Sequence, residues 1–116
     1  MKKYQLGEFE EIVMLTVAIL YKEAYGVSIK KEIETRLNRT VSVGALQTAL
    51  KRLEDKGYLK SYEGGATEER AGRPKKFFQI TALGKRAMEH VKATRDALWG
   101  SISKMAWDSK SLAIPI

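Results

Sequence analysis

The chain has 116 residues, of which 44% are hydrophobic and 30% charged, and it contains no cysteine. This length predicts one domain with a modest core, and the composition excludes a disordered chain, a disulfide scaffold and a thiolate metal site. No segment approaches the length of a membrane span and the N-terminus lacks the features of a signal peptide, so we expect a cytoplasmic protein. The formal net charge of +7 favours a polyanionic partner.

The first two helices are predicted over residues 7–22 and 27–38. In each segment the side chains expected in the core recur at three- and four-residue steps and therefore share one face. These side chains are Phe9, Ile12, Val13, Thr16, Ile19 and Leu20 in the first segment, and Ile29, Ile33 and Leu37 in the second. The connection to the next amphipathic segment is short, as a helix-turn-helix requires.

A third helix is predicted over residues 42–56, with Ser42 suited to cap its N-terminus and Gly57 suited to end it. Val43, Leu46, Leu50 and Leu53 share one face, which we expect in the core. At about 100° per residue, Gly44, Ala45, Thr48, Lys51 and Arg52 point away from that face, and Gln47 lies on its flank.

This order suits a helix that enters a DNA groove. Small side chains permit close approach, amide and hydroxyl groups can read base edges, and cations can hold phosphates. We therefore expect this helix to contact DNA, with Ser42 at its start. The alternative is an ordinary amphipathic surface helix, which would show similar polarity.

Two β-prone runs, residues 58–62 and 75–80, predict a hairpin with a long basic connection over residues 64–74. The stretch from Arg70 to Lys76 carries four cations, Arg70, Arg73, Lys75 and Lys76, and no acid. We expect these cations to reach phosphates or the minor groove. The alternative is a solvated loop without a partner.

A last helix is predicted over residues 83–108, with Thr81 as its N-cap. Its apolar positions follow steps close to a heptad seam, which indicates dimerisation through this helix. The predicted seam contains Ala87, Val91, Thr94, Leu98, Ile102 and Met105, widened by Met88, Trp99 and Ala106. The alternative is a helix that folds back onto its own core.

Together these elements predict a mainly α fold, a winged helix-turn-helix over residues 1–80 followed by a dimerisation helix and tail over 81–116. No catalytic, metal or cofactor site is expected. His90 is the only histidine, and the chain has neither a phosphate-binding glycine loop nor a nucleophile elbow. The alternative to a DNA-binding regulator is a winged-helix module that binds proteins, and RNA binding is a further alternative that lacks an aromatic stacking face.

Several linked motifs resemble the PadR family of bacterial transcriptional regulators, in order and over residues 6–105. They are LGEFEEIV at 6–13, EAYGVSI at 23–29, VSVGAL at 41–46, RLEDKGYL at 52–59 and RPKKFFQIT at 73–81. The resemblance implies a homodimeric repressor that binds a palindromic site in double-stranded DNA and responds to a small molecule or a stress signal. It places the recognition helix over 42–56, the wing over 58–80 and the dimer helix in the C-terminal third.

One position departs from the family pattern, and another suggests an effector contact. Family members often carry Tyr where this chain has Gln47, and glutamine can still hydrogen-bond a phosphate or an adenine edge but lacks the aromatic packing. Some members also hold flat aromatic molecules between paired tryptophans, which makes Trp99 the candidate contact for an aromatic effector. The preferred interpretation of Trp99 is nevertheless packing of the dimer interface.

Overall fold

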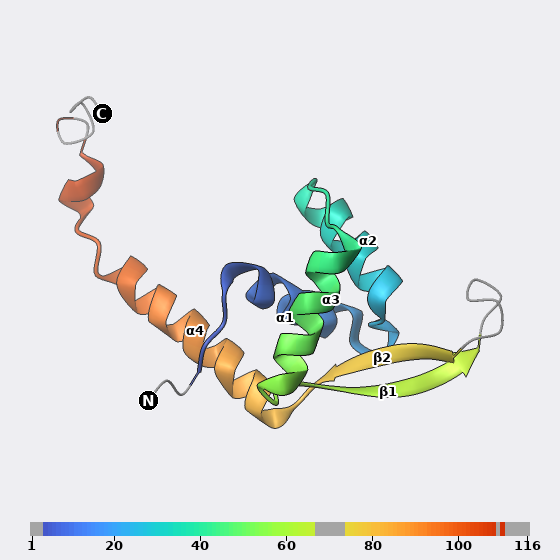
Figure 1. The fold of residues 1–116 in the computed structure, drawn as a ribbon. Coiled ribbons are helices and arrows are strands. Elements are labelled where there is room, and N and C mark those ends of the chain that lie inside the picture. Colours follow the sequence, from blue (N-terminus) through green and yellow to red (C-terminus); the bar gives the residue numbers. More distant parts are fainter. Residues whose placement is uncertain (1–3, 67–73, 109, 111–116) are drawn as a thin grey trace.

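The computed structural model describes residues 4–66, 74–108 and 110. Its elements in chain order are α1 (Glu8–Leu20), η1 (Tyr21–Glu23), α2 (Gly26–Leu37), α3 (Val43–Asp55), β1 (Leu59–Ala66), β2 (Pro74–Ile80), α4 (Ala82–Gly100) and η3 (Lys104–Trp107). Figure 1 shows α1, α2 and α3 gathered into one body, with the β1–β2 hairpin extending from one side and α4 leaving on the other. The predicted winged helix-turn-helix with a C-terminal helix is confirmed.

Local chemistry fixes the ends of the helices. The hydroxyl of Ser42 accepts the Ala45 N–H at 3.1 Å and the hydroxyl of Thr81 accepts the Gly84 N–H at 2.9 Å, so both predicted N-caps are confirmed. Beyond α3, Gly57 has a φ of +79°, the left-handed conformation in which glycine costs least. At the end of α2 the same role falls to Asn38, with a φ of +49°.

The three N-terminal helices close around one core, to which the base of the hairpin and the start of α4 contribute Leu59, Phe78 and Ala87. The largest fully buried side chains are Met14, Ile29, Ile33, Leu46, Leu50, Leu53, Val13 and Val17. Ala87, expected in a dimer seam, is fully buried within its own chain. The first turns of α4 therefore belong to the domain core.

Three residues expected in the core are exposed. On α1 the buried face is centred on Val13, Met14 and Val17, which places Ile19 on the opposite side of the helix. Leu37 and Val43 lie at either end of the α2–α3 turn, where Figure 1 shows the helix pair projecting beyond α1, and Val43 is 61% exposed. The core side of α3 is completed instead by Ala49.

The last helix is shorter than predicted. α4 ends at Gly100, Ser101 is its C-cap, and a new 3₁₀ turn starts after Ser103, whose hydroxyl accepts the Met105 N–H at 3.1 Å. Glycine weakens a helix, and serine hydroxyls offer the backbone alternative hydrogen bonds. Ile102 consequently lies between two helices, and Met105 belongs to η3.

The hairpin has two antiparallel strands, with Leu59 opposite Ile80 and Tyr62 opposite Phe77. β1 starts one residue later than expected and runs on to Ala66, while β2 starts at Pro74. Residues 67–73, the tip of the predicted wing, lie outside the described residues. So does the apolar C-terminal stretch 112–116.

The molecule is elongated. Its radius of gyration is 18.1 Å, against about 13 Å for a compact chain of this length, and its longest dimension is 62 Å. Figure 1 shows two extensions from the helical body, α4 with η3 on one side and the β1–β2 hairpin on the other. Within the described part of the chain, no helix combines the length and apolar content needed to cross a bilayer.

Candidate nucleic-acid interface

The outward face of α3 matches the predicted order of side chains. Gly44, Ala45, Gln47, Thr48, Lys51 and Arg52 are all exposed. A Cβ built on Gly44 would meet nothing within 4 Å, so the start of α3 is open to a close-fitting surface. Lys51 is 3.7 Å from Asp55 one turn further along, an exposed pair that contributes little to stability and leaves the ammonium available.

Gln47 lies toward the start of α2. Its amide nitrogen is 3.6 Å from the position that a Cβ would occupy on Gly26, the first residue of that helix. An added Cβ would make an ordinary van der Waals contact with the amide, so Gln47 packs close to the start of α2. The side chain is exposed and can turn toward a ligand that lies across both α2 and α3.

The helix-turn-helix connection is held by Glu34. One of its carboxylate oxygens accepts the Val41 N–H at 2.8 Å and also the Lys30 ammonium at 3.0 Å. These two hydrogen bonds lower the pKa of Glu34 below its ordinary value of 4.5, with the Val41 N–H as the larger cause. The bond from α2 to Val41, two residues before α3, fixes how the third helix leaves the turn.

The far end of α3 is held by Lys56. Its ammonium donates to the Glu10 carboxylate and to the Gln5 carbonyl, both at 2.8 Å. Burial alone would raise the pKa of Glu10, but hydrogen bonds from Lys56 and the Gly7 N–H, together with the nearby cations, leave that pKa below its ordinary value. Both ends of α3 are therefore tied to neighbouring helices by charged hydrogen bonds.

An aromatic cluster attaches the wing to the helical body. The Phe78 N–H donates to the Ala24 carbonyl at 2.8 Å, and Tyr25 forms an isolated β-bridge with Phe77. The Phe77 ring meets Tyr25 edge-on at 5.5 Å and stacks on Tyr62 at 5.7 Å. A Cβ on Gly64 would come within 2.1 Å of the Phe77 ring, so this position requires glycine.

The two wing lysines in the described part of β2 have different surroundings. Lys75 is only 9% exposed, and its ammonium lies 4.0 Å from the centre of the Tyr25 ring, a cation–π contact. Buried in this way, Lys75 has little to offer a phosphate, which the sequence-based expectation did not anticipate. Lys76 is exposed and 3.4 Å from Glu54.

Glu54 links the wing to α3. One carboxylate oxygen accepts the Ser61 hydroxyl of β1 at 2.7 Å, while the other faces Lys76 of β2. Both strands are thereby joined to the helix that carries the candidate DNA-contacting face. Neither Glu54 nor Glu34 stood out in the sequence, because each lies on an ordinary charged face of a helix.

The remaining predicted residues lie elsewhere. Arg70 and Arg73 fall outside the described residues. The residues predicted for the dimer interface are on the half of the molecule away from the wing. Val91 is half-buried, and Leu98, Trp99, Ile102 and Met105 are exposed in the single chain.

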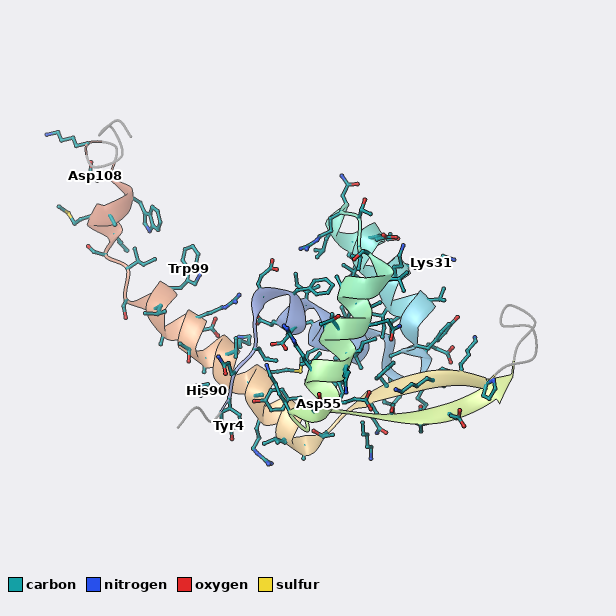
Figure 2. The ribbon with its side chains drawn as sticks, viewed as in Figure 1. Tyr4, Lys31, Asp55, His90, Trp99 and Asp108 are labelled. Atoms are coloured by element: carbon teal, nitrogen blue, oxygen red, sulfur yellow. The ribbon has the colours of Figure 1, made fainter. Side chains whose placement is uncertain are left out.

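Trp99 stacks on Trp107, with ring centres 6.4 Å apart and planes 22° apart. Figure 2 shows Trp99 standing off α4, well separated from the helical body. Both rings remain more than half exposed. The stack joins the end of α4 to η3 across the break in the helix.

A groove of about 780 Å³ runs between α1, the end of β2 and α4. Its apolar lining includes Leu15, Ala18, Ile80 and Met88, and charged side chains such as Glu89 and Lys92 stand among its lining residues. Beside it, Arg95 of α4 is 2.8 Å from Glu11 of α1, which fixes the angle at which α4 leaves the body. The end of α4 and η3, residues 98–107, also expose apolar side chains, and these residues are called the C-terminal segment below.

The Transcriptional regulator PadR-like family matches residues 14–90. A PadR-like transcription factor from Bacteroides fragilis is similar in structure, with a TM-score of 0.67 and 26% identity over 80% of this chain and 84% of that one. A PadR family transcription regulator from Clostridium difficile is 32% identical, with a TM-score of 0.57, over 77% of this chain and 91% of that one. A PadR family transcriptional regulator from Eggerthella lenta has a TM-score of 0.63 and 26% identity, over 84% of this chain and 85% of that one.

No curated protein sequence matches this chain. The family match nevertheless covers most of the chain, and it includes α2, α3 and both strands of the wing. The fold supports DNA-binding transcriptional regulation, and the predicted resemblance is confirmed. This protein belongs to the PadR-like family of transcriptional regulators.

Proposed function

We propose that this protein is a homodimeric repressor that binds a palindromic operator in double-stranded DNA and releases it in response to a small molecule or stress signal. The observation that carries the proposal is the exposed face of α3, whose small and polar first turns are followed by Lys51 and Arg52. Such a face fits a major groove, with base edges read at the start of the helix and phosphates held further along.

The wing extends this surface. Glu54 and the aromatic cluster around Phe77 hold the hairpin at a fixed angle to α3, so a duplex that meets α3 would also meet the hairpin. We infer that Lys76, Arg70 and Arg73 contact phosphates or the minor groove there. Pro74 stiffens the chain next to Arg73.

Dimerisation is supported by two apolar features on one chain. The C-terminal segment exposes Leu98, Trp99 and Met105, and the α1–α4 groove offers an apolar lining of matching character. If each copy places its C-terminal segment on the other copy, both features are buried and the contact closes with two-fold symmetry. Two copies of α3 would then meet two half-sites of a palindrome.

The test is binding to operator and random duplexes over a range of salt concentrations. The operator is sought in the DNA upstream of the protein's own gene, because such repressors often bind there. We expect affinity to fall steeply with salt, and the operator to be preferred at every concentration. If the affinity for duplex DNA does not change with salt concentration, or if no duplex is bound, the alternative of a protein-interaction module is favoured.

Repression is tested separately, by transcription in vitro from the promoter that carries the operator. Added protein should reduce transcript, and the reduction should require an intact operator. An increase in transcript would make the protein an activator while leaving its DNA binding in place.

A further inference from the structure

Val43 is an exposed apolar residue at the start of α3. It is the first residue of the helix, 61% of its surface is exposed, and it was expected in the core. A single exposed valine is common on protein surfaces and needs no explanation by itself. Val43 nevertheless stands at the start of α3, the helix proposed to enter the major groove, where an exposed side chain can contact a base.

The first turn of α3 carries few side chains. The Ser42 hydroxyl accepts the Ala45 N–H and keeps its own proton to donate, and Gly44 has no side chain. The exposed apolar atoms of this turn are the methyl groups of Val43 and Ala45, and Val43 lies one turn before Gln47 on the same side of the helix. Polar side chains begin one turn later, with Gln47 and Thr48.

Only one base edge in the major groove is apolar. Guanine, adenine and cytosine present donors and acceptors there, whereas thymine presents its 5-methyl group beside one acceptor. The cations on the following turns, Lys51 and Arg52, make a nucleic acid a better occupant of this surface than an apolar protein partner. We propose that Val43 is a specificity-determining residue that contacts a thymine 5-methyl group in each half-site.

This inference rests on the proposed DNA binding, and the experiment separates the two. Operator duplexes are prepared in which each thymine in turn is replaced by deoxyuridine, which removes only the methyl group and keeps the base pair. Wild-type protein should lose about fourfold in affinity at one thymine of a half-site, the effect of one methyl group returned to water. Val43→Ala should bind the unmodified operator more weakly and lose nothing further at that position.

Val27→Ala is the matched control, because Val27 is a half-exposed valine on α2. It should retain the full deoxyuridine effect. Val43 is exposed, so Val43→Ala should fold normally, which circular dichroism checks.

If wild type and Val43→Ala lose the same affinity at every deoxyuridine, or if neither loses any, the inference is wrong while the DNA-binding proposal stands. If wild type binds no duplex at all, both are wrong.

Discussion

Side chains on successive turns of α3 should have separable roles. Gln47 and Thr48 lie where base edges are expected, and Lys51 and Arg52 lie where phosphates are expected. Replacing either cation by Ala should weaken binding to operator and random duplexes about equally. It should also flatten the salt slope by roughly one unit for each phosphate that is no longer neutralised, hence about two for a dimer.

Replacing Gln47 or Thr48 by Ala should instead erode the preference for operator over random DNA and leave the salt slope unchanged. Fluorescence anisotropy at several salt concentrations measures both quantities. Unchanged affinity and slope in both Lys51→Ala and Arg52→Ala would contradict the proposed docking of α3.

Glu34 should make the helix-turn-helix sensitive to acid. Its pKa is lower in the folded chain than the ordinary value of 4.5, because the carboxylate accepts the Val41 N–H and the Lys30 ammonium. The stability that this carboxylate contributes is therefore fully present above about pH 4.5 and is lost as the pH falls through the lower folded pKa. Glu34→Gln should be less stable than wild type at neutral pH.

The difference in unfolding free energy between wild type and Glu34→Gln should shrink below pH 4.5, as measured by urea unfolding over a pH series. Glu32→Gln serves as the control, because Glu32 pairs with Arg36 one turn along the same helix and not with the α2–α3 turn. A difference that stays constant down to pH 3 would mean that the charge of Glu34 does not support the turn.

At the scale of elements, Lys75 and Lys76 of β2 should have different roles, the first in the stability of the wing and the second in DNA binding. Lys75 is buried against Tyr25 and Lys76 is exposed, so the strand alternation separates them. Lys76→Met should flatten the salt slope of DNA binding by about one unit per protomer. Lys75→Met should leave that slope unchanged and lower the thermal midpoint by a few degrees, because the cation–π interaction with Tyr25 is removed.

Both lysine variants have the same change in net charge, so each controls for the other. The slope is read from binding isotherms and the midpoint from thermal unfolding followed by circular dichroism. A flattened slope in Lys75→Met would return Lys75 to the set of phosphate-contacting residues.

The sequence predicts elements better than it predicts their ends and contacts. The order of helices and strands follows from periodicity and from caps such as Ser42, Thr81 and Gly57, which act within a few residues. Val43 fails the prediction because periodicity reports which way a side chain points and not whether another element lies over it. The outward direction of Gly44, Thr48 and Lys51 was predictable, because periodicity alone determines which side chains point away from the core.

Contacts between distant segments could not be predicted. In the sequence Lys75 is one of four wing cations, yet its burial depends on Tyr25, fifty residues earlier in the chain. Glu54 likewise joins α3 to the wing through Ser61 and Lys76. Such pairings depend on the angle between the hairpin and the helices, which no local pattern encodes.

For the whole molecule, the unpaired C-terminal segment should govern assembly. Leu98 is exposed on the single chain and would be buried between two copies. Leu98→Asp would place a charge in that interface, so the dimer should dissociate and affinity for a two-half-site operator should fall by at least tenfold. Ala93→Asp introduces the same charge about 140° around α4 and should remain dimeric.

Sedimentation equilibrium measures the mass of both variants, and anisotropy measures their binding to operators with one or two half-sites. A monomeric wild type, or an Ala93→Asp variant as weakened as Leu98→Asp, would exclude the proposed face of α4. In either case Trp99 would not pack a dimer interface on this face of α4.

Trp99 offers the means to detect an effector. Its ring stacks on Trp107 at the end of α4, and both rings are exposed enough to admit a flat aromatic molecule. A ligand that induces release must bind the DNA-free dimer more tightly than the DNA-bound dimer, and by linkage a tenfold preference weakens DNA binding tenfold at saturation.

Planar aromatic compounds should quench tryptophan fluorescence saturably, and the quenching should weaken in Trp99→Phe. Trp107→Phe is the matched variant: quenching that persists in Trp99→Phe and vanishes in Trp107→Phe would place the ligand on Trp107. If no compound produces a saturable response, the two rings serve only to pack the C-terminal segment.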